Sequence, residues 1–225
     1  STFLSNGRYS DSYNHDYHNG YISDWIKKAT LAITLADEKA ADLVSEHDIN
    51  FNKNVKAFAR IWRVVMISEY TDNFGPYPIE AFQGTNPAFN SVQEVYYFML
   101  DELKAAVADI VLSEEPTADE AKSDPIFGYN AEKWAKYGNG WRLRLAMRLS
   151  EVDGAKAKSE FEAVDKNMLI KTLDETAKVK EYNQWNAWAG IYSRSWHIIS
   201  LPSSMSNILV GLGGVSVAEQ RPDLA

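Results

Sequence analysis

Apolar residues recur at the three- and four-residue spacing of amphipathic helices over most of the first 166 positions. This spacing predicts helices over residues 23–46, 52–70, 91–113 and 130–151, and a shorter helix that ends near 166. Ser23 and Ser91 are suitable N-cap residues, and Glu94 completes a capping box with Ser91. The second helix is expected to end before Gly75, because two prolines follow that glycine.

The remaining segments lack this period. Residues 1–20 contain Gly, Ser, Asn, Asp and Tyr in no helical pattern, so we expect a loop there. Residues 117–124 form a polar linker, 168–173 could be a short extended piece, and 200–217 are rich in Ser and Gly. The pattern predicts one all-α domain over 1–225, built from stacked helical hairpins with irregular loops. Tetratricopeptide-like packing is one version of this fold, although no 34-residue period is visible.

Charge and composition exclude several classes of partner and site. The net charge of −8 and the pI of about 5.1 argue against nucleic acid, which requires a basic surface. The chain has no cysteine, and therefore no disulfide, thiolate nucleophile or cysteine metal ligand. No apolar run is long enough to span a bilayer. The abrupt polar start and end suggest a chain incomplete at both ends, with any export signal or lipid anchor lying outside it.

Catalytic and metal-binding patterns find no support. There is no nucleophile elbow, phosphate-binding glycine loop or Cys/His pair, so we expect no enzyme and no cofactor. His15 and His18 are three residues apart, but no third ligand has a matching spacing, so we interpret both as polar surface residues rather than a metal site. Arg142, Arg144 and Arg148 are expected to pair with carboxylates of an adjacent helix rather than to bind a ligand.

Two aromatic clusters are the strongest candidates for ligand contact. Tyrosines recur every four residues from 9 to 21 among Asn and Asp, and a second cluster at 182–196 mixes Trp and Tyr with Asn, Gln and Arg. Flat aromatic faces beside amide and carboxylate groups suit sugar rings, although the same spacing also fits a core stripe. The ligand-binding candidates are Tyr13, Asn14, Tyr17, Trp185, Trp188 and Trp196.

Two longer motifs resemble a known family. Residues 60–82 read RIWRVVMISEYTDNFGPYPIEAF, and residues 130–151 read NAEKWAKYGNGWRLRLAMRLSE. Their order and content resemble the paired signature of the SusD/RagB family, with Gly140 and Trp141 replacing the commoner Ser-Leu pair. The resemblance covers about the first half of a typical member.

Membership in that family would imply a tetratricopeptide-like protein, lipid-anchored to the outer membrane at the cell surface. It would bind an oligosaccharide without catalysis and pass it to a TonB-dependent, SusC-like outer-membrane transporter. The two motifs are scaffold motifs and bring no ligand residues with them. Other readings stay open: a helical-repeat scaffold that binds protein, a family relative with peptide cargo, or, more remotely, a glycoside hydrolase that would need an inward-facing carboxylate pair.

If the 182–196 cluster binds sugar, its tryptophans act as exposed platforms. We then expect Trp185→Ala or Trp188→Ala to weaken glycan binding by about 1–3 kcal/mol, with the melting temperature nearly unchanged. Calorimetric titration and thermal unfolding of each variant measure the two quantities. A large fall in melting temperature would instead identify the residue as part of the core.

Overall fold

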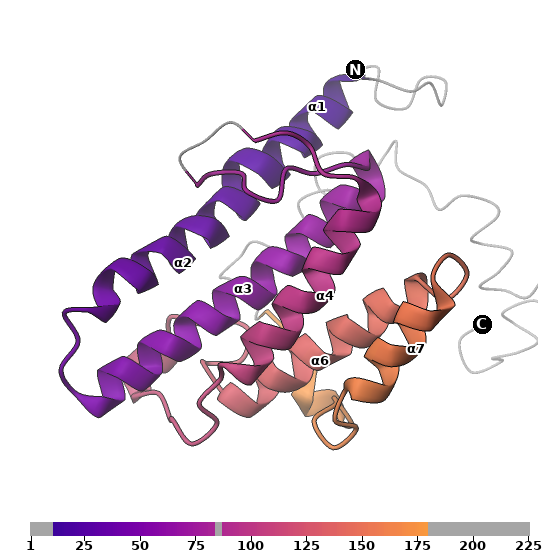
Figure 1. Cartoon of the computed structure of the whole chain (residues 1–225). Coiled ribbons are helices and arrows are strands. Elements are labelled where there is room, and N and C mark those ends of the chain that lie inside the picture. The colour runs from indigo at the N-terminus through magenta and orange to yellow at the C-terminus, as the bar shows by residue number, and fades with distance from the viewer. Residues whose placement is uncertain (1–10, 84–86, 180–225) are drawn as a thin grey trace, which may run out of the picture. The chain divides into compact units, whose positions relative to one another are not determined.

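The structure is a computed structural model that describes residues 11–83 and 87–179, and this part of the chain is helical (Figure 1). Its backbone contains no strand, only an isolated antiparallel bridge between Tyr77 and Asn90. The predicted all-α class is therefore confirmed. The elements are α1 (Asp11–Asn19), the π-helical turn η2 (Gly20–Ile26), α2 (Lys27–Ala40), α3 (Glu46–Phe74), α4 (Val92–Ala108), α5 (Ala118–Ala121), α6 (Ala131–Arg148), α7 (Gly154–Ala163) and the 3-10 turn η3 (Leu173–Glu175).

The N-terminal loop prediction is wrong over residues 11–19, which form α1. The helical path continues through η2 into α2, so Ser23 lies inside a helical segment and is not an N-cap. Tyr21 and Ile26 are buried against the rest of the fold. This packing stabilises a helix that polar, weakly helix-forming residues would not favour by themselves.

Helix α3 is longer than predicted at both ends. It begins at Glu46 because the Ser45 hydroxyl accepts a hydrogen bond from the Asp48 amide at 3.0 Å. It ends where Gly75 adopts a φ of 86°, with its amide donating to the Thr71 carbonyl at 2.9 Å. The first predicted helix was too long, since α2 ends at Ala40.

Three further helices begin at capped residues, and the starts of α4 and α6 are the predicted ones. Ser91 and Glu94 form the expected capping box at the start of α4. The Asn130 side chain caps α6, and the Asp153 side chain caps α7. The polar linker contains the short helix α5, and the 168–173 piece forms no strand.

Each long helix packs on the next, in the order α2, α3, α4, α6 and α7, and α6 also contacts α3. Their shared core includes the fully buried residues Ile61, Val64, Val95, Met99, Leu103 and Leu145. None of the described helices is both long enough and apolar enough to cross a membrane.

Ion pairs join helices that are distant in sequence. The Arg60 guanidinium meets Glu102 through two hydrogen bonds of 2.9 Å, and Arg63 reaches the same carboxylate at 2.7 Å. Burial alone would raise the pKa of Glu102, but the hydrogen bonds and charges of the two arginines outweigh it and hold that pKa below its ordinary value. Arg142 is buried and pairs with Glu160 at 2.5 Å, and Arg148 pairs with Asp72. The structural role predicted for these two arginines is confirmed.

The close approach of α6 to its neighbours depends on Gly138. A Cβ at this position would lie 2.6 Å from Val107 Cγ2 and 3.0 Å from Ile61 Cδ1. We therefore expect Gly138→Ala to lower the free energy of unfolding by about 1–3 kcal/mol, measured by urea denaturation. Gly140 in the same helix is the matched control, because no atom lies within 4 Å of its Cβ position. Gly140→Ala is expected to raise the free energy of unfolding by about 0.5–1 kcal/mol, because alanine favours a helix more than glycine does. Equal effects of the two substitutions on the free energy of unfolding would contradict this packing.

Candidate functional site

A groove between α2 and α3 is the most promising binding site in the described part of the chain. A cavity of about 560 Å³ opens there, with Trp25 and Trp62 among its lining residues. Small side chains at Ala29, Ala32 and Ala59 leave this space between the two helices. The lining is completed by Asp24, Lys28, Met66 and Glu69.

An aromatic row leads along the N-terminal helix to this groove. The rings of Tyr17 and Tyr21 lie 5.7 Å apart, and those of Tyr21 and Trp25 meet edge to face at 4.7 Å. Trp25 is 43% exposed, so much of its surface remains available. Tyr21 and Trp25 both belong to η2, and π-helical turns are frequent at functional sites.

Polar groups border the groove, and one of them, Glu69, binds the neighbouring Tyr21. The Tyr21 hydroxyl donates to Glu69 Oε2 at 2.6 Å. Burial, together with the hydrogen bond to this carboxylate, holds the pKa of Tyr21 well above its ordinary value, so the tyrosine stays a donor at neutral pH. Asp24 forms an exposed ion pair with Lys28 at 3.1 Å. The rim therefore offers both hydrogen-bond donors and acceptors.

The groove continues along α3 beyond Trp62. A second cavity, of about 410 Å³, shares Ala32, Ala59 and Trp62 with the first and extends to Tyr129. A third, of about 430 Å³, shares Tyr129 with the second and reaches Phe51. We call this continuous surface, from Trp25 to Phe51, the aromatic groove. Flat apolar faces beside polar rims suit ligands that carry both C–H surfaces and hydroxyl or amide groups.

The predicted ligand residues are only partly placed. Tyr13, Asn14 and Tyr17 belong to α1, where Asn14 is exposed and Tyr17 is 59% exposed. Trp185, Trp188 and Trp196 lie outside the described residues, so their role stays a prediction. Asn14 and Tyr17 are not among the residues that line the cavities of the aromatic groove, and the Tyr17 ring lies beside that of Tyr21.

Trp25 and Trp62 were not among the ligand residues predicted from the sequence. A signal for Trp25 was present, because it continues the four-residue tyrosine series that ends at Tyr21. Trp62 is in fact half-buried: it packs against the core and also lines the groove. The exposure of Trp62 depends on the distance between α2 and α3, and the spacing of apolar residues in the sequence does not specify that distance.

The histidine and arginine predictions have mixed outcomes. His15 is exposed as expected and interacts with Asn19, four residues along. His18 is instead half-buried, 3.0 Å from the Tyr70 hydroxyl and in edge contact with Phe74. Among the described residues, no three His, Cys, Asp or Glu side chains are arranged to hold a metal ion. Arg144 lies over the Trp141 ring at 5.2 Å.

Comparison with known proteins relates this chain to one family model. A family model described as SusD-like, Susd and RagB outer membrane lipoprotein, matches residues 3–215. No match was found among curated proteins.

Solved structures share its fold. A SusD homolog from Parabacteroides distasonis ATCC 8503 is 27% identical, with a TM-score of 0.68, over 85% of this chain and 37% of that one. A protein described as Bacteroidetes AC2a SusD-like is 28% identical, with a TM-score of 0.64, over 78% of this chain and 31% of that one. A chitin-binding protein at 22% identity has a TM-score of 0.65 over 78% of this chain and 36% of that one, which shows the fold alone. The chain therefore spans about a third of the length of these structures.

The bond between Tyr21 and Glu69 fixes one wall of the groove and can be tested separately. Tyr21→Phe keeps the ring and removes the donor. We expect the free energy of unfolding to fall by about 1 kcal/mol in urea denaturation, because Glu69 is exposed and can bind water instead. Tyr17→Phe, on an exposed ring of the same row, is expected to change it by less than about 0.5 kcal/mol. A Tyr21 variant as stable as the Tyr17 variant would show that the bond contributes nothing.

Proposed function

Because the chain belongs to the SusD/RagB family of outer-membrane lipoproteins, we propose that it is part of a cell-surface protein that captures an oligosaccharide. In this proposal the protein is lipid-anchored at the outer membrane and passes its cargo to a TonB-dependent, SusC-like transporter. It binds without catalysis.

The observation that carries the proposal is the aromatic groove. Trp25 and Trp62 line the same cavity, and carboxylates and a lysine occupy its rim. A pyranose ring presents an apolar C–H face and hydroxyl groups at its edge, so one ligand can use both kinds of surface. Asp24 and Glu69 are each engaged by a neighbouring side chain, which suits hydrogen bonding to a ligand better than proton transfer.

Peptide cargo is the alternative, favoured by the small apolar residues of the groove. Ala29, Ala32, Ala59 and Met66 would receive apolar peptide side chains as readily as sugar rings. A peptide ligand would also agree with a scaffold role, since stacked helical hairpins commonly present such surfaces. The two proposals differ in the ligand that saturates the groove.

A titration with defined oligosaccharides tests the proposal. We expect one glycan class, from a panel that includes chitin oligosaccharides, to bind saturably in calorimetry. Trp25→Ala is expected to weaken that binding by about 1–3 kcal/mol, because it removes an exposed platform without opening the core. Thermal unfolding of the variant should match that of the parent chain.

Phe161→Ala is the matched control for this experiment. Phe161 is 45% exposed, much like Trp25, but lies on α7 and lines none of the cavities of the aromatic groove. Unchanged affinity in this variant, with lost affinity in Trp25→Ala, would support the groove. Full affinity in Trp25→Ala would place the site elsewhere, and binding of peptides but no glycan would favour the alternative.

A further inference from the structure

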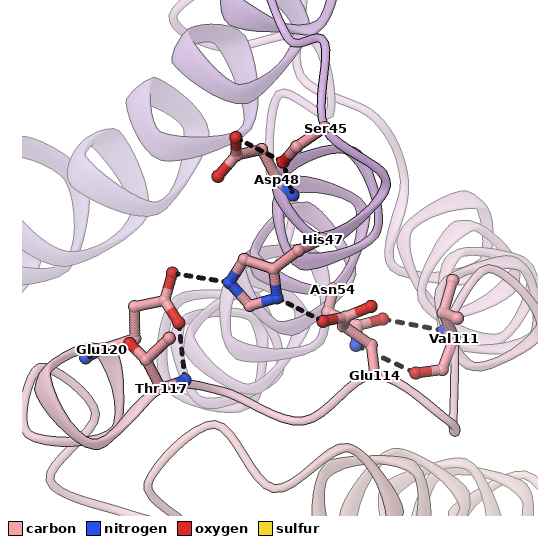
Figure 2. Close-up of polar contacts among 8 residues, drawn as sticks. All are labelled: Ser45, His47, Asp48, Asn54, Val111, Glu114, Thr117 and Glu120. Carbon is pink, nitrogen blue, oxygen red and sulfur yellow. Dashed lines mark hydrogen bonds and ion pairs between the residues drawn. The ribbon is translucent and has the colours of Figure 1, made fainter.

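A histidine at the start of α3 lies between two carboxylates of the linker that joins α4 to α6. His47 Nδ1 is 2.5 Å from Glu114 Oε1, and His47 Nε2 is 3.2 Å from Glu120 Oε1 (Figure 2). Glu114 is largely buried, with 13% of its side chain exposed, and the His47 side chain is 35% exposed. The linker thus meets α3 through one imidazole ring that faces two acids.

This geometry requires a particular protonation state of His47. An ionised carboxylate only accepts hydrogen bonds, and a neutral imidazole has a single N–H to donate. Both glutamates are satisfied only when both ring nitrogens carry a proton, which is the imidazolium form. In agreement, the hydrogen bonds to Glu114 and then to Glu120 raise the pKa of His47 above its ordinary value.

The two ends of the linker are held by hydrogen bonds that do not involve His47. The Asn54 side chain donates to the Val111 carbonyl at 3.0 Å and accepts from the Val111 amide at 2.7 Å (Figure 2). At the other end, the buried Asp124 carboxylate accepts from the Tyr129 amide and from the Trp134 indole, both at 2.8 Å. Within the described residues, no residue of α3 other than His47 forms a hydrogen bond or ion pair with segment 112–123.

The other charged groups near His47 are engaged elsewhere or exposed. Asp48 bonds to the Ser45 hydroxyl at 2.5 Å, within the N-terminal turn of α3. On the linker side, Lys122 pairs with Asp119 at 2.7 Å on the surface. The remaining neighbour, Phe51, is uncharged and stacks on the imidazole at 5.8 Å between ring centres.

We propose that His47 is a pH-operated clip, which holds linker segment 112–123 on α3 when protonated and releases the segment when it loses its proton. Deprotonation leaves one of the two carboxylates facing a ring lone pair, and Glu114 is too buried for water to compensate fully. The bonds of Asn54 and Asp124 do not involve His47, so the two ends stay in place while the middle opens. Phe51 belongs to the aromatic groove, so the clip stands at one end of that groove.

The direction of the pH effect follows from the raised pKa. The clip is fully formed below the ordinary histidine value of about 6.5 and is lost as pH rises through the higher value of the folded state. The change is therefore expected at a pH above that ordinary value. The proposed role of His47 does not depend on the proposed ligand, so its test can succeed or fail independently of the proposed function.

Trypsin cleavage after Lys122 reports the opening of the segment. The rate is measured by mass spectrometry of the released peptides at pH 6 and pH 9, in the parent chain and in His47→Gln. Glutamine keeps one donor but never carries a charge. At each pH, the cleavage rate of His47→Gln is divided by that of the parent chain, so that the pH dependence of trypsin itself cancels. We expect His47→Gln to be cleaved about tenfold faster at pH 6, and the ratio to fall to about one at pH 9. A ratio that is the same at both pH values would overturn the proposal.

His15→Gln is the matched control, because His15 is exposed on α1 and bonds to Asn19 of the same helix, and its ratio is expected to stay near one at both pH values. If His47→Gln unfolds, the NMR titration of His47 in the parent chain and in Glu120→Gln decides the question. The midpoint is expected above 6.5 in the parent chain and lower in Glu120→Gln. A His47 midpoint at or below the ordinary value, or one that Glu120→Gln leaves unchanged, would rule out the clip.

Discussion

The close approach of α6 to α3 and α4 at Gly138 is the constraint on which the helical stack depends. Without a side chain at this position, Ile61 and Val107 can fill the space between the three helices. That contact buries the α6 residues on either side of it, including Trp134 and Leu145. Most of the stability of a helix in a folded protein comes from such faces buried on its neighbours.

Around this core, charged side chains fix how the helices are placed relative to one another. In a chain with a net charge of −8, carboxylates are plentiful, and Arg60, Arg63 and Arg142 each pair with one. Glu102 serves two arginines of α3, and Glu160 joins α7 to α6 through Arg142. Such pairs contribute less to stability than apolar contacts do. Removing one partner of a pair is nevertheless destabilising, because it leaves the other charge buried without a counter-charge. They therefore favour a single arrangement of the stack.

The family resemblance and the candidate site lie on different parts of the molecule. The two signature segments supply core residues such as Ile61, Val64 and Leu145, and the ion pairs that hold the helices together. The aromatic groove combines Trp62 of a signature segment with Trp25, which lies outside both. Family membership thus accounts for the scaffold but does not identify a ligand.

The sequence by itself determined the helical class and the starts of α4 and α6, because caps and apolar spacing act over only a few residues. Ser91 with Glu94 and Asn130 are local signals of this kind, and the signature segments indicated the family. Only the tertiary structure decided that polar residues 11–19 form a helix, because the burial of Tyr21 against α3 outweighs their weak propensity. It also decided that Trp25 and Trp62 share one cavity and that His47 meets two glutamates of a distant linker. Both depend on the spacing between packed helices, which no local pattern in the sequence encodes.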